Sequence, residues 1–304
     1  MKDGLLGLSI GEAFGVQLDG ELPNRSNPIT YMSEYRSYDV SVGGYSDDTC
    51  MCLCVMDSYI KNKEFNYKDI MDNMCDWVNT NKYSSSDSLF DISKTVRFSL
   101  MNYWKNKDIE LSGIGGDDKQ DASCLSRVLP VAVYVNKNKI KDIDLYNIIR
   151  NLTNITHSNE ISFLGAFILT KYLVYILGGL DSNKALSALK RYKYEKFFND
   201  NTIDKYNRIL RDDIKKYNFS EININNNIVS VLESVFWIIE NTDNYKDAVI
   251  ASGIIGGANG VRGSITGMIA GIIYSKKNIP KEWLELLKRK DYLEKMIRKY
   301  NVLI

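Results

Sequence analysis

Proline is scarce in this chain, with 4 residues in 304, and the strict alternation of apolar and polar residues that marks half-buried strands is nearly absent. Proline interrupts helices, so its scarcity leaves long stretches free to be helical. Apolar residues recur instead at spacings of three and four, as at Ile70, Met74 and Trp77, which is typical of a helix with one buried face. The sequence therefore predicts an all-α fold.

The chain lacks an excess of charge of either sign, since 39 basic and 38 acidic side chains leave a formal net charge of +1. A protein without a strong net field has no general attraction for nucleic acid or for an anionic membrane, so we expect no direct nucleic-acid binding. The N-terminus also lacks the basic region, apolar stretch and cleavage site of a secretion signal. These absences favour a cytoplasmic protein.

The two most apolar stretches, 161–180 and 248–273, lack the uninterrupted apolar length of a membrane span. The first contains Lys171, and the second contains Asn259 and Arg262, which are costly in hydrocarbon. We therefore expect buried helices and no membrane association. No linker is long enough to demand two domains, so residues 1–304 are predicted to form a single domain, and the sequence assigns no oligomeric state.

The chain also lacks a cysteine pattern that would make disulfides or hold a soft metal ion. Its 5 cysteines are an odd number, and on a helix Cys52 would point away from Cys50 and Cys54. Free cysteine packs as a small apolar residue, so we expect buried, unreactive thiols rather than a metal or redox site.

What the chain does contain is a dense group of oxygen-bearing residues, Tyr45-Ser46-Asp47-Asp48-Thr49, just before an apolar helical run. Carboxylate and hydroxyl oxygens are the ligands that Mg²⁺ and Ca²⁺ prefer, whereas nitrogen and sulfur suit them poorly. Ser46, Asp47 and Asp48 are therefore candidate ligands of a hard divalent cation.

Glycine is concentrated in three segments, 11–20, 113–116 and 253–263. Glycine lets backbone approach a ligand closely or adopt a positive φ, so the clusters suggest one pocket where these segments meet. Close packing of helices at glycine is an equally weighted alternative for each cluster.

Several segments together have the order and spacing of one family. They are Gly7-Leu8-Ser9-Ile10-Gly11-Glu12-Ala13-Phe14-Gly15-Val16, Ser46-Asp47-Asp48-Thr49, Arg127-Val128-Leu129-Pro130, Thr156-His157, Gly256-Gly257 with the helix 265–274 after it, and the closing 279–284. The ordered set resembles the ADP-ribosylglycohydrolase family over nearly the whole chain. The resemblance implies a compact orthogonal bundle of helices that removes ADP-ribose from a side chain or small acceptor, with two Mg²⁺ ions in a cleft.

The resemblance also implies roles for individual residues. Ser46, Asp47 and Asp48 match the first group of metal ligands, and the two aspartates are candidate catalytic residues. Asp19 lies near the position of a family glutamate and is a candidate base, one carbon shorter. The ligand-binding candidates are Gly115, Gly116, Ser123, His157, Gly257, Asn259 and Arg262. The expected ligand is ADP-ribose or an ADP-ribosylated substrate.

One motif departs from the family pattern. The family follows Gly-Gly with a second group of metal ligands, Asp-x-Asp-Thr, but this chain has Ala258, Gly260 and Val261 at those three places. None of the three can ligate through its side chain, so we expect one Mg²⁺ at most, or none. Arg262 could replace part of the lost cation charge by pairing with Asp47, Asp48 or a ligand phosphate. The alternative is a solvent-exposed or helix-end arginine.

Three functions follow from this mixture of retained and lost motifs. The first is hydrolysis of an ADP-ribosyl glycosidic linkage by a one-ion or remodelled metal site. The second is a pseudoenzyme that binds ADP-ribose, an ADP-ribosylated protein or a related nucleotide without cleavage. The third is a hydrolase or lyase for a different nucleotide, since a fold does not determine a function.

Overall fold

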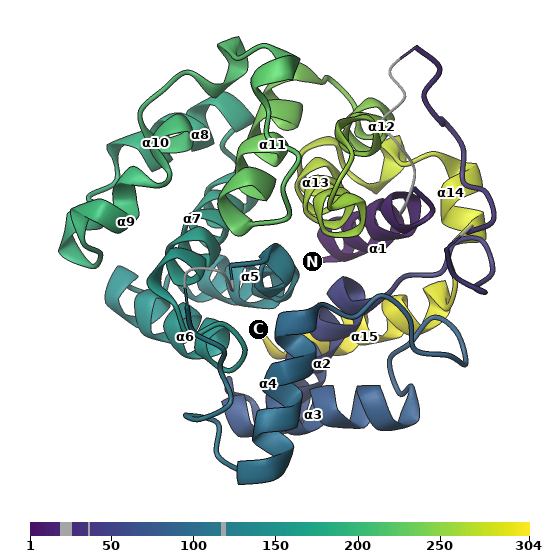
Figure 1. Ribbon diagram of the computed structural model, residues 1–304, viewed down its shortest axis with the longest axis vertical. Helices are drawn as coiled ribbons and strands as arrows, with labels where there is room; N and C mark the ends of the chain where they lie inside the picture. Colours follow the sequence, from purple (N-terminus) through teal and green to yellow (C-terminus); the bar gives the residue numbers. More distant parts are fainter. Residues whose placement is uncertain (19–25, 36, 117–119) are drawn as a thin grey trace.

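Helices are the regular structure of the described chain, with only two isolated β-bridges beside them. The computed structural model describes residues 1–18, 26–35, 37–116 and 120–304. The α-helices are α1 (Lys2–Val16), α2 (Asp47–Asn62), α3 (Tyr67–Thr80), α4 (Lys94–Asn106), α5 (Leu129–Asn138), α6 (Asp142–Asn154), α7 (Glu160–Leu177), α8 (Ser182–Arg191), α9 (Asp200–Asp204), α10 (Asn207–Leu210), α11 (Ile228–Asn241), α12 (Tyr245–Ile255), α13 (Asn259–Tyr274), α14 (Lys281–Leu286) and α15 (Lys290–Leu303). The 3₁₀ turns are η1 (Ala122–Cys124), η2 (Ser126–Val128), η3 (Tyr194–Lys196), η4 (Ile214–Lys216), η5 (Phe219–Glu221) and η6 (Lys276–Asn278). The helices cross at steep angles in a compact orthogonal bundle (Figure 1), which confirms the predicted all-α fold.

Asparagine begins many of these helices. The side chains of Asn66, Asn159, Asn199, Asn227 and Asn244 each accept a hydrogen bond from a backbone N–H of the first turn. Each such cap satisfies one of the N–H groups that a helix start leaves free, and it stabilises the helix by about 1 kcal/mol. The asparagine-rich connections of the sequence therefore set where several helices start.

The first helix packs directly against a helix from the far end of the chain. Glycines of α1 face glycines of α13 so closely that a Cβ added to Gly11 would lie 2.1 Å from the carbonyl oxygen of Gly263. A Cβ on Gly267 would lie 2.2 Å from the oxygen of Gly7. In Figure 1 the purple α1 lies beside the yellow-green α13. For Gly11 and Gly263, which belong to the predicted clusters, the helix-packing alternative is confirmed, and the contact of α1 with α13 joins segments from opposite ends of the chain.

Helix α7 is the one described helix that is long and apolar enough to cross a membrane. In the fold most of its residues are buried, and it packs against α5, α6, α8 and α11. Lys171 lies within it, 7% exposed, with its Nζ 2.9 Å from Asp142 Oδ1. The second apolar stretch of the sequence, 248–273, lies in α12 and α13, with a break between the helices at Gly256 and Gly257. Both stretches are therefore largely buried in the bundle, as predicted.

All 5 cysteines are buried and free of disulfides. Burial is the first cause that raises the pKa of the Cys50, Cys52 and Cys54 thiols. Because the thiolate is the reactive form, these thiols are held in the unreactive state. The predicted buried thiols are confirmed. One apolar core includes residues from Leu5 to Tyr300, and the single domain stays a prediction.

Candidate active site

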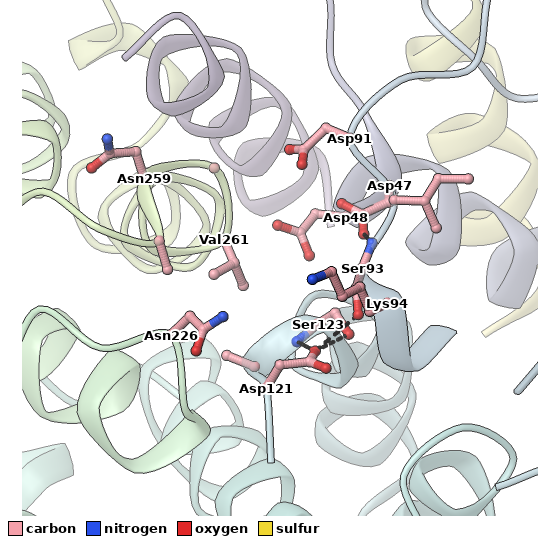
Figure 2. Close-up of a pocket in the computed structure, with 14 residues that line it drawn as sticks. Asp47, Asp48, Asp91, Ser93, Lys94, Asp121, Ser123, Asn226, Asn259 and Val261 are labelled. Atoms are coloured by element: carbon pink, nitrogen blue, oxygen red, sulfur yellow. Dashed lines mark hydrogen bonds between the residues drawn. The ribbon is translucent and has the colours of Figure 1, made fainter. Parts of the chain in front are cut away.

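A pocket of about 350 Å³ opens where the N-terminal ends of several helices meet (Figure 2). Asp47 and Asp48 begin α2, Lys94 begins α4, and Asn259 begins α13, and all of them line this pocket. Helix N-termini carry free N–H groups and a partial positive charge, which favour anions. These helix starts favour a negatively charged group, whereas the lining itself is acidic, with Asp47, Asp48, Asp91 and Asp121 beside the single cation of Lys94.

Glu12 connects the middle of α1 to the start of α2. Its Oε1 accepts hydrogen bonds from Ser46 Oγ (2.8 Å) and the Asp48 backbone N–H (2.9 Å), and its Oε2 accepts from the Thr49 N–H (3.0 Å) and Thr49 Oγ1 (2.5 Å). A carboxylate at a helix N-terminus satisfies free N–H groups and opposes the helix dipole. Glu12 thus holds Ser46, Asp47 and Asp48 in place. Sequence reasoning missed this role, although Glu12 is the one acid in the interior of this glycine-spaced apolar helix, whose other acid, Asp3, lies in the first turn.

Glu12, Asp47 and Asp48 form an acidic corner of the site, which carries more negative charge than its surroundings compensate. Oxygen atoms of Glu12, Asp47 and Asp48 all lie within 4.8 Å of one another, and none of the three forms an ion pair among the described residues. Burial raises the pKa of Glu12 to about 7 despite its hydrogen bonds. Burial first, and then the neighbouring carboxylates, raise the pKa of Asp47 and Asp48 well above their ordinary values.

A hard divalent cation fits this corner. The Oδ1 atom of Asp48 is buried and has no hydrogen-bond partner, and Asp48 is 1% exposed. Buried charges in proteins are normally paired or bound to metal, and carboxylate oxygens are the ligands of Mg²⁺. The corner could therefore hold a metal ion, as predicted for Ser46, Asp47 and Asp48, and the structure adds Glu12 to that group.

We expect the metal-free protein to gain stability as the pH falls from about 8 to about 5. The pKa of Glu12 in the folded state, about 7, is above its ordinary value of 4.5, so the folded state takes up this proton first. The stabilisation is fully present below pH 4.5 and is lost as the pH rises through about 7. Thermal melts in EDTA should show this slope, and Glu12→Gln should reduce it, leaving the part due to Asp47 and Asp48, while the exposed Glu64→Gln leaves it unchanged. A wild-type melting temperature that is constant over this range would contradict the expectation.

The wall opposite the acidic corner is formed by the start of α13. Ala258, Gly260 and Val261 line the pocket there and contribute no side-chain oxygen. One turn later, Ser264 Oγ donates a hydrogen bond to Asp48 Oδ2 (2.7 Å). Because the second acidic motif is lost, Ala258, Gly260 and Val261 present an apolar surface on this side of the pocket. The Ser264 hydroxyl is hydrogen-bonded to one carboxylate oxygen of Asp48.

Asp121 forms a second polar centre at the pocket. Its Oδ1 accepts hydrogen bonds from Ser93 Oγ (3.1 Å) and from the N–H (3.1 Å) and Oγ (2.5 Å) of Ser123. His157 Nε2 lies 3.3 Å from the same oxygen, and His157 Nδ1 lies 2.8 Å from Thr156 Oγ1. Although burial opposes it, the contact with His157 and further hydrogen bonds hold the pKa of Asp121 well below its usual range. The sequence places Asp121 at the start of the segment 121–127, which resembles the family's diphosphate-binding loop, but sequence reasoning assigned no role to the Asp121 side chain.

His157 is placed behind Asp121 rather than on the pocket wall. It is fully buried and not among the residues that line the pocket, whereas Ser123 does line it. His157 therefore orients Asp121 in this structure, and its predicted direct contact with a ligand stays a prediction.

The comparisons with known proteins agree with this geometry. The family model described as ADP-ribosylglycohydrolase matches residues 1–304. This chain belongs to the ADP-ribosylglycohydrolase family. It is 26% identical over 300 residues to the ADP-ribosylarginine hydrolase Tri1 of Serratia proteamaculans, covering 97% of this chain and 77% of that protein. It is 22% identical to the ADP-ribosyl-[dinitrogen reductase] glycohydrolase of Rhodospirillum rubrum, covering 97% of this chain and 91% of that protein.

Similarity to a solved structure supports the same fold. An ADP-ribosylglycohydrolase-related protein complex matches with a TM-score of 0.80 at 19% sequence identity, over 99% of this chain and 96% of that chain. At this identity the likeness shows the fold, and the chemistry must be argued from the residues.

Among the residues predicted from the family, Arg262 is placed differently from expectation. It is 0% exposed in the first turn of α13, where its Nε donates to Ser234 Oγ (2.7 Å) and its Nη1 donates to the carbonyl oxygen of Gly256. Neither Asp47 nor Asp48 is among its described partners, so the predicted pairing with them is wrong. Of the alternative, solvent exposure is wrong, but the position at a helix end agrees with the structure. Arg262 binds the carbonyl oxygen of Gly256, the residue that follows the C-terminus of α12, where a cation opposes the helix dipole, while its Nη2 is buried without a hydrogen-bond partner. Its contact with a ligand stays a prediction.

Gly257 and Asn259, two of the predicted ligand-binding residues, lie at the start of α13. Gly257 has a φ of 76°, and a Cβ there would lie 2.0 Å from the Ile224 carbonyl oxygen, so the turn before α13 requires glycine. Asn259 lines the pocket, but its Nδ2 donates to the Leu18 carbonyl oxygen (3.0 Å). Packing at the start of α13 therefore accounts for Gly257, whereas the Oδ1 of Asn259 is buried without a hydrogen-bond partner. Ligand binding by Gly257 and Asn259 stays a prediction.

The remaining predicted residues lie at the edge of the described structure. Gly115 and Gly116 are exposed, beside Ile114, whose backbone bonds to Thr156 and Ser158 bring this segment next to His157. Residues 117–119 and Asp19, the predicted base, lie outside the described residues. Diphosphate binding by Gly115 and Gly116 stays a prediction.

Proposed function

We propose that this family member hydrolyses the glycosidic bond between ADP-ribose and an acceptor side chain. The observation that carries the proposal is the buried carboxylate corner of Asp47 and Asp48 on the wall of a pocket built from helix N-termini. Such a pocket suits an anionic diphosphate ligand, while carboxylates suit water activation and cation binding. Two of the similar proteins are named ADP-ribosylarginine hydrolases, so ADP-ribosylated arginine is the first substrate to test.

Glu12, Asp47 and Asp48 are the residues that would hold Mg²⁺ in this reaction. A bound divalent cation would orient the ribose hydroxyls and make a bound water more acidic. Because Ala258, Gly260 and Val261 offer no oxygen on the opposite wall, we propose a reduced site rather than the full two-ion arrangement of the family. The reduced site has one ion or a changed set of ligands.

The chain's own residues supply the remaining chemistry. In the hydrolysis, a water oxygen bonds to the anomeric carbon, the bond from that carbon to the acceptor nitrogen breaks, and the acceptor leaves with the proton that the water loses. Asp47 and Asp48 are the carboxylates on the pocket wall that would accept that proton from the water and pass it to the acceptor. Glu12 keeps both in position through its bonds to the start of α2.

A second function, binding without cleavage, is favoured by one specific observation. The pocket retains its helix N-termini and polar centre at Asp121, while the α13 wall has lost every acidic side chain. A pocket of this kind could recognise ADP-ribose through its phosphates and sugar hydroxyls without activating water.

One experiment separates the two functions. The full chain is incubated with an ADP-ribosylated arginine peptide and, separately, an ADP-ribosylated serine peptide, with Mg²⁺ or with EDTA, and released ADP-ribose is measured. We expect release from the arginine peptide that requires Mg²⁺. Stabilisation of the protein by free ADP-ribose in EDTA, with no product under any condition, would instead support the binding function.

A further inference from the structure

An apolar groove of about 310 Å³ lies between α3 and α4, which are packed side by side (Figure 1). The residues that line it include Val78, Leu89, Ile92, Leu100, Met101 and Trp104. This volume is at the lower end of the range for pockets that hold whole small molecules, so it suits one or two side chains. The groove is therefore a candidate site for an apolar side chain of another polypeptide.

The outer face of α4 extends the apolar surface of the groove. Phe98, Met101 and Trp104 are 49%, 55% and 43% exposed, and they lie at intervals of three residues along one side of the helix. Single exposed apolar side chains are common, but a contiguous exposed group marks an interaction surface. Aromatic residues and methionine are also enriched at protein interfaces. This face of α4 is therefore suited to a protein partner.

The groove is next to the pocket of Asp47 and Asp48, because Ile92 lines both of them. Lys94 lines the same pocket at the start of α4, and Trp104 follows ten residues later in the helix, about 15 Å away at 1.5 Å per residue. An extended polypeptide advances about 3.3 Å per residue, so about five residues span this distance. A polypeptide with its modified residue in the pocket thus reaches the groove.

Helix α4 carries positive charge only. Its charged residues are Lys94, Arg97 and Lys105, and none of the three forms an ion pair with a described residue. Arg97 is also the one charged residue among those that line the groove. Unpaired cations beside an apolar groove are complementary to a segment in which acidic residues surround an apolar side chain. The charge on α4 therefore indicates the chemistry of the partner segment.

Two other occupants fit this surface less well. Helices that lie on a membrane present a protruding apolar face to the lipid, whereas Met101 and Trp104 form the wall of a concavity. In a two-fold dimer both copies contribute the same patch, so Lys94, Arg97 and Lys105 would be brought towards the same cations of the second copy. Like charges that face each other cost free energy. An acidic segment of a separate protein avoids both difficulties.

We propose that the groove between α3 and α4 binds the acceptor protein. It holds a large apolar side chain that lies beside acidic residues and within about five residues of the ADP-ribosylated arginine. The assignment rests on the proposed function for the presence of an ADP-ribosylated acceptor, and it specifies which acceptors the protein selects. Because the groove lies beside the pocket of Asp47 and Asp48 and not in it, it contributes to binding of the polypeptide and not to cleavage of the bond.

Matched substrates test this assignment. They are free ADP-ribosylarginine, a peptide with leucine between glutamates four residues before and four residues after the modified arginine, and the same peptide with serine in place of leucine. The wild type is compared with a double variant, Met101→Ser with Trp104→Ala. The control is Ile143→Ser, since Ile143 is 50% exposed on α6 and lines none of the described pockets.

We expect the double variant to hydrolyse the leucine peptide with a kcat/KM at least about tenfold lower than the wild type, mainly through a higher KM. Truncation of side chains at the centre of an interface weakens binding, whereas the pocket itself is unchanged. Free ADP-ribosylarginine and the serine peptide should be hydrolysed as by the wild type, and Ile143→Ser should match the wild type throughout. Equal kcat/KM of wild type and double variant on the leucine peptide would overturn the proposal, and so would an equal loss on all three substrates.

Peptide binding in EDTA separates this proposal from the proposed function. In fluorescence anisotropy the ADP-ribosylated leucine peptide should bind the wild type about tenfold more tightly than the serine peptide, and the double variant should lose this difference. Such a difference without hydrolysis of any substrate would support the groove and contradict the hydrolase, whereas hydrolysis without a preference for the leucine peptide would do the reverse. Without that preference, a dimer in sedimentation or binding to phosphatidylserine vesicles that the double variant abolishes would assign the surface to another occupant and overturn the proposal.

Discussion

Replacing Asp48 by asparagine is expected to lower Mg²⁺-dependent release of ADP-ribose from an arginine peptide by at least about 100-fold. Even residues that only support metal ligands change activity by about 10- to 100-fold, so the loss of a direct ligand should reach or exceed that range. Asp48 is the acid whose Oδ1 has no partner within the protein, and its Oδ2 is positioned by Ser264. Asparagine keeps the shape and the hydrogen bond but removes the charge that binds the cation. Initial rates under saturating Mg²⁺ provide the measurement.

The matched control is Asp76→Asn, which removes the same charge from an exposed position on α3. It should keep the wild-type rate. Folding of the Asp48 variant is verified by its melting temperature in EDTA, which should equal or exceed that of the wild type, since one of several repelling charges is gone. A well-folded Asp48→Asn protein with the wild-type rate would show that the acidic corner does not participate in the reaction.

Replacing Gly11 by alanine is expected to destabilise the fold by about 3 kcal/mol or more. The new Cβ would lie 2.1 Å from the carbonyl oxygen of Gly263 and 2.9 Å from its carbonyl carbon. Overpacking in a core costs about 1 to 3 kcal/mol when side chains can adjust, and here the obstacle is the backbone of α13. The helix-forming advantage of alanine over glycine, about 1 kcal/mol, is too small to compensate. Separating α1 from α13 would also displace Glu12, so cation affinity should fall with stability.

Gly4→Ala is the matched control, because it makes the same substitution in the same helix. Its Cβ would lie 3.1 Å from Leu129 Cδ1 and 3.2 Å from Ile272 Cδ1, which are ends of flexible side chains. Urea denaturation should therefore show a large drop in midpoint for Gly11→Ala and a small change of either sign for Gly4→Ala. Equal midpoints for the two variants would mean that the contact of α1 with α13 is looser than these distances require.

The acidic corner was predictable because its members are neighbours in the chain. Asp47 and Asp48 lie side by side at the start of a helix, so their proximity needs no knowledge of the fold. The missing acids at residues 258, 260 and 261 could be recognised for the same reason, since the motif is contiguous. Arg262 shows where this reasoning stops. It adjoins the motif in sequence, yet its side chain turns to Ser234 and Gly256, because packing of α11 and α12 and not sequence proximity sets its partners.

Glu12, Asp91 and Asp121 could not be predicted by such reasoning. Glu12 reaches residues 36 and 37 positions later in the chain, and His157 lies 36 positions after Asp121. Within its own segment, none of these three acids has neighbours in the sequence that would indicate its role. The glycine-rich segments show the same limit. A glycine in the sequence can line a pocket or allow a close contact between helices. The short distances between α1 and α13 show that Gly7, Gly11, Gly263 and Gly267 allow such a contact.

The sequence alone determined the helical character of this protein, the acidic start of α2 and the absence of acids at the start of α13. These features depend on periodicity and on neighbouring residues, which are local properties of a chain. Only the tertiary structure decided that Glu12 anchors the corner, that Asp91 lines the same pocket from another connection and that Arg262 points away. Those facts depend on the packing of helices remote in sequence, where backbone contact between α1 and α13 sets which side chains meet.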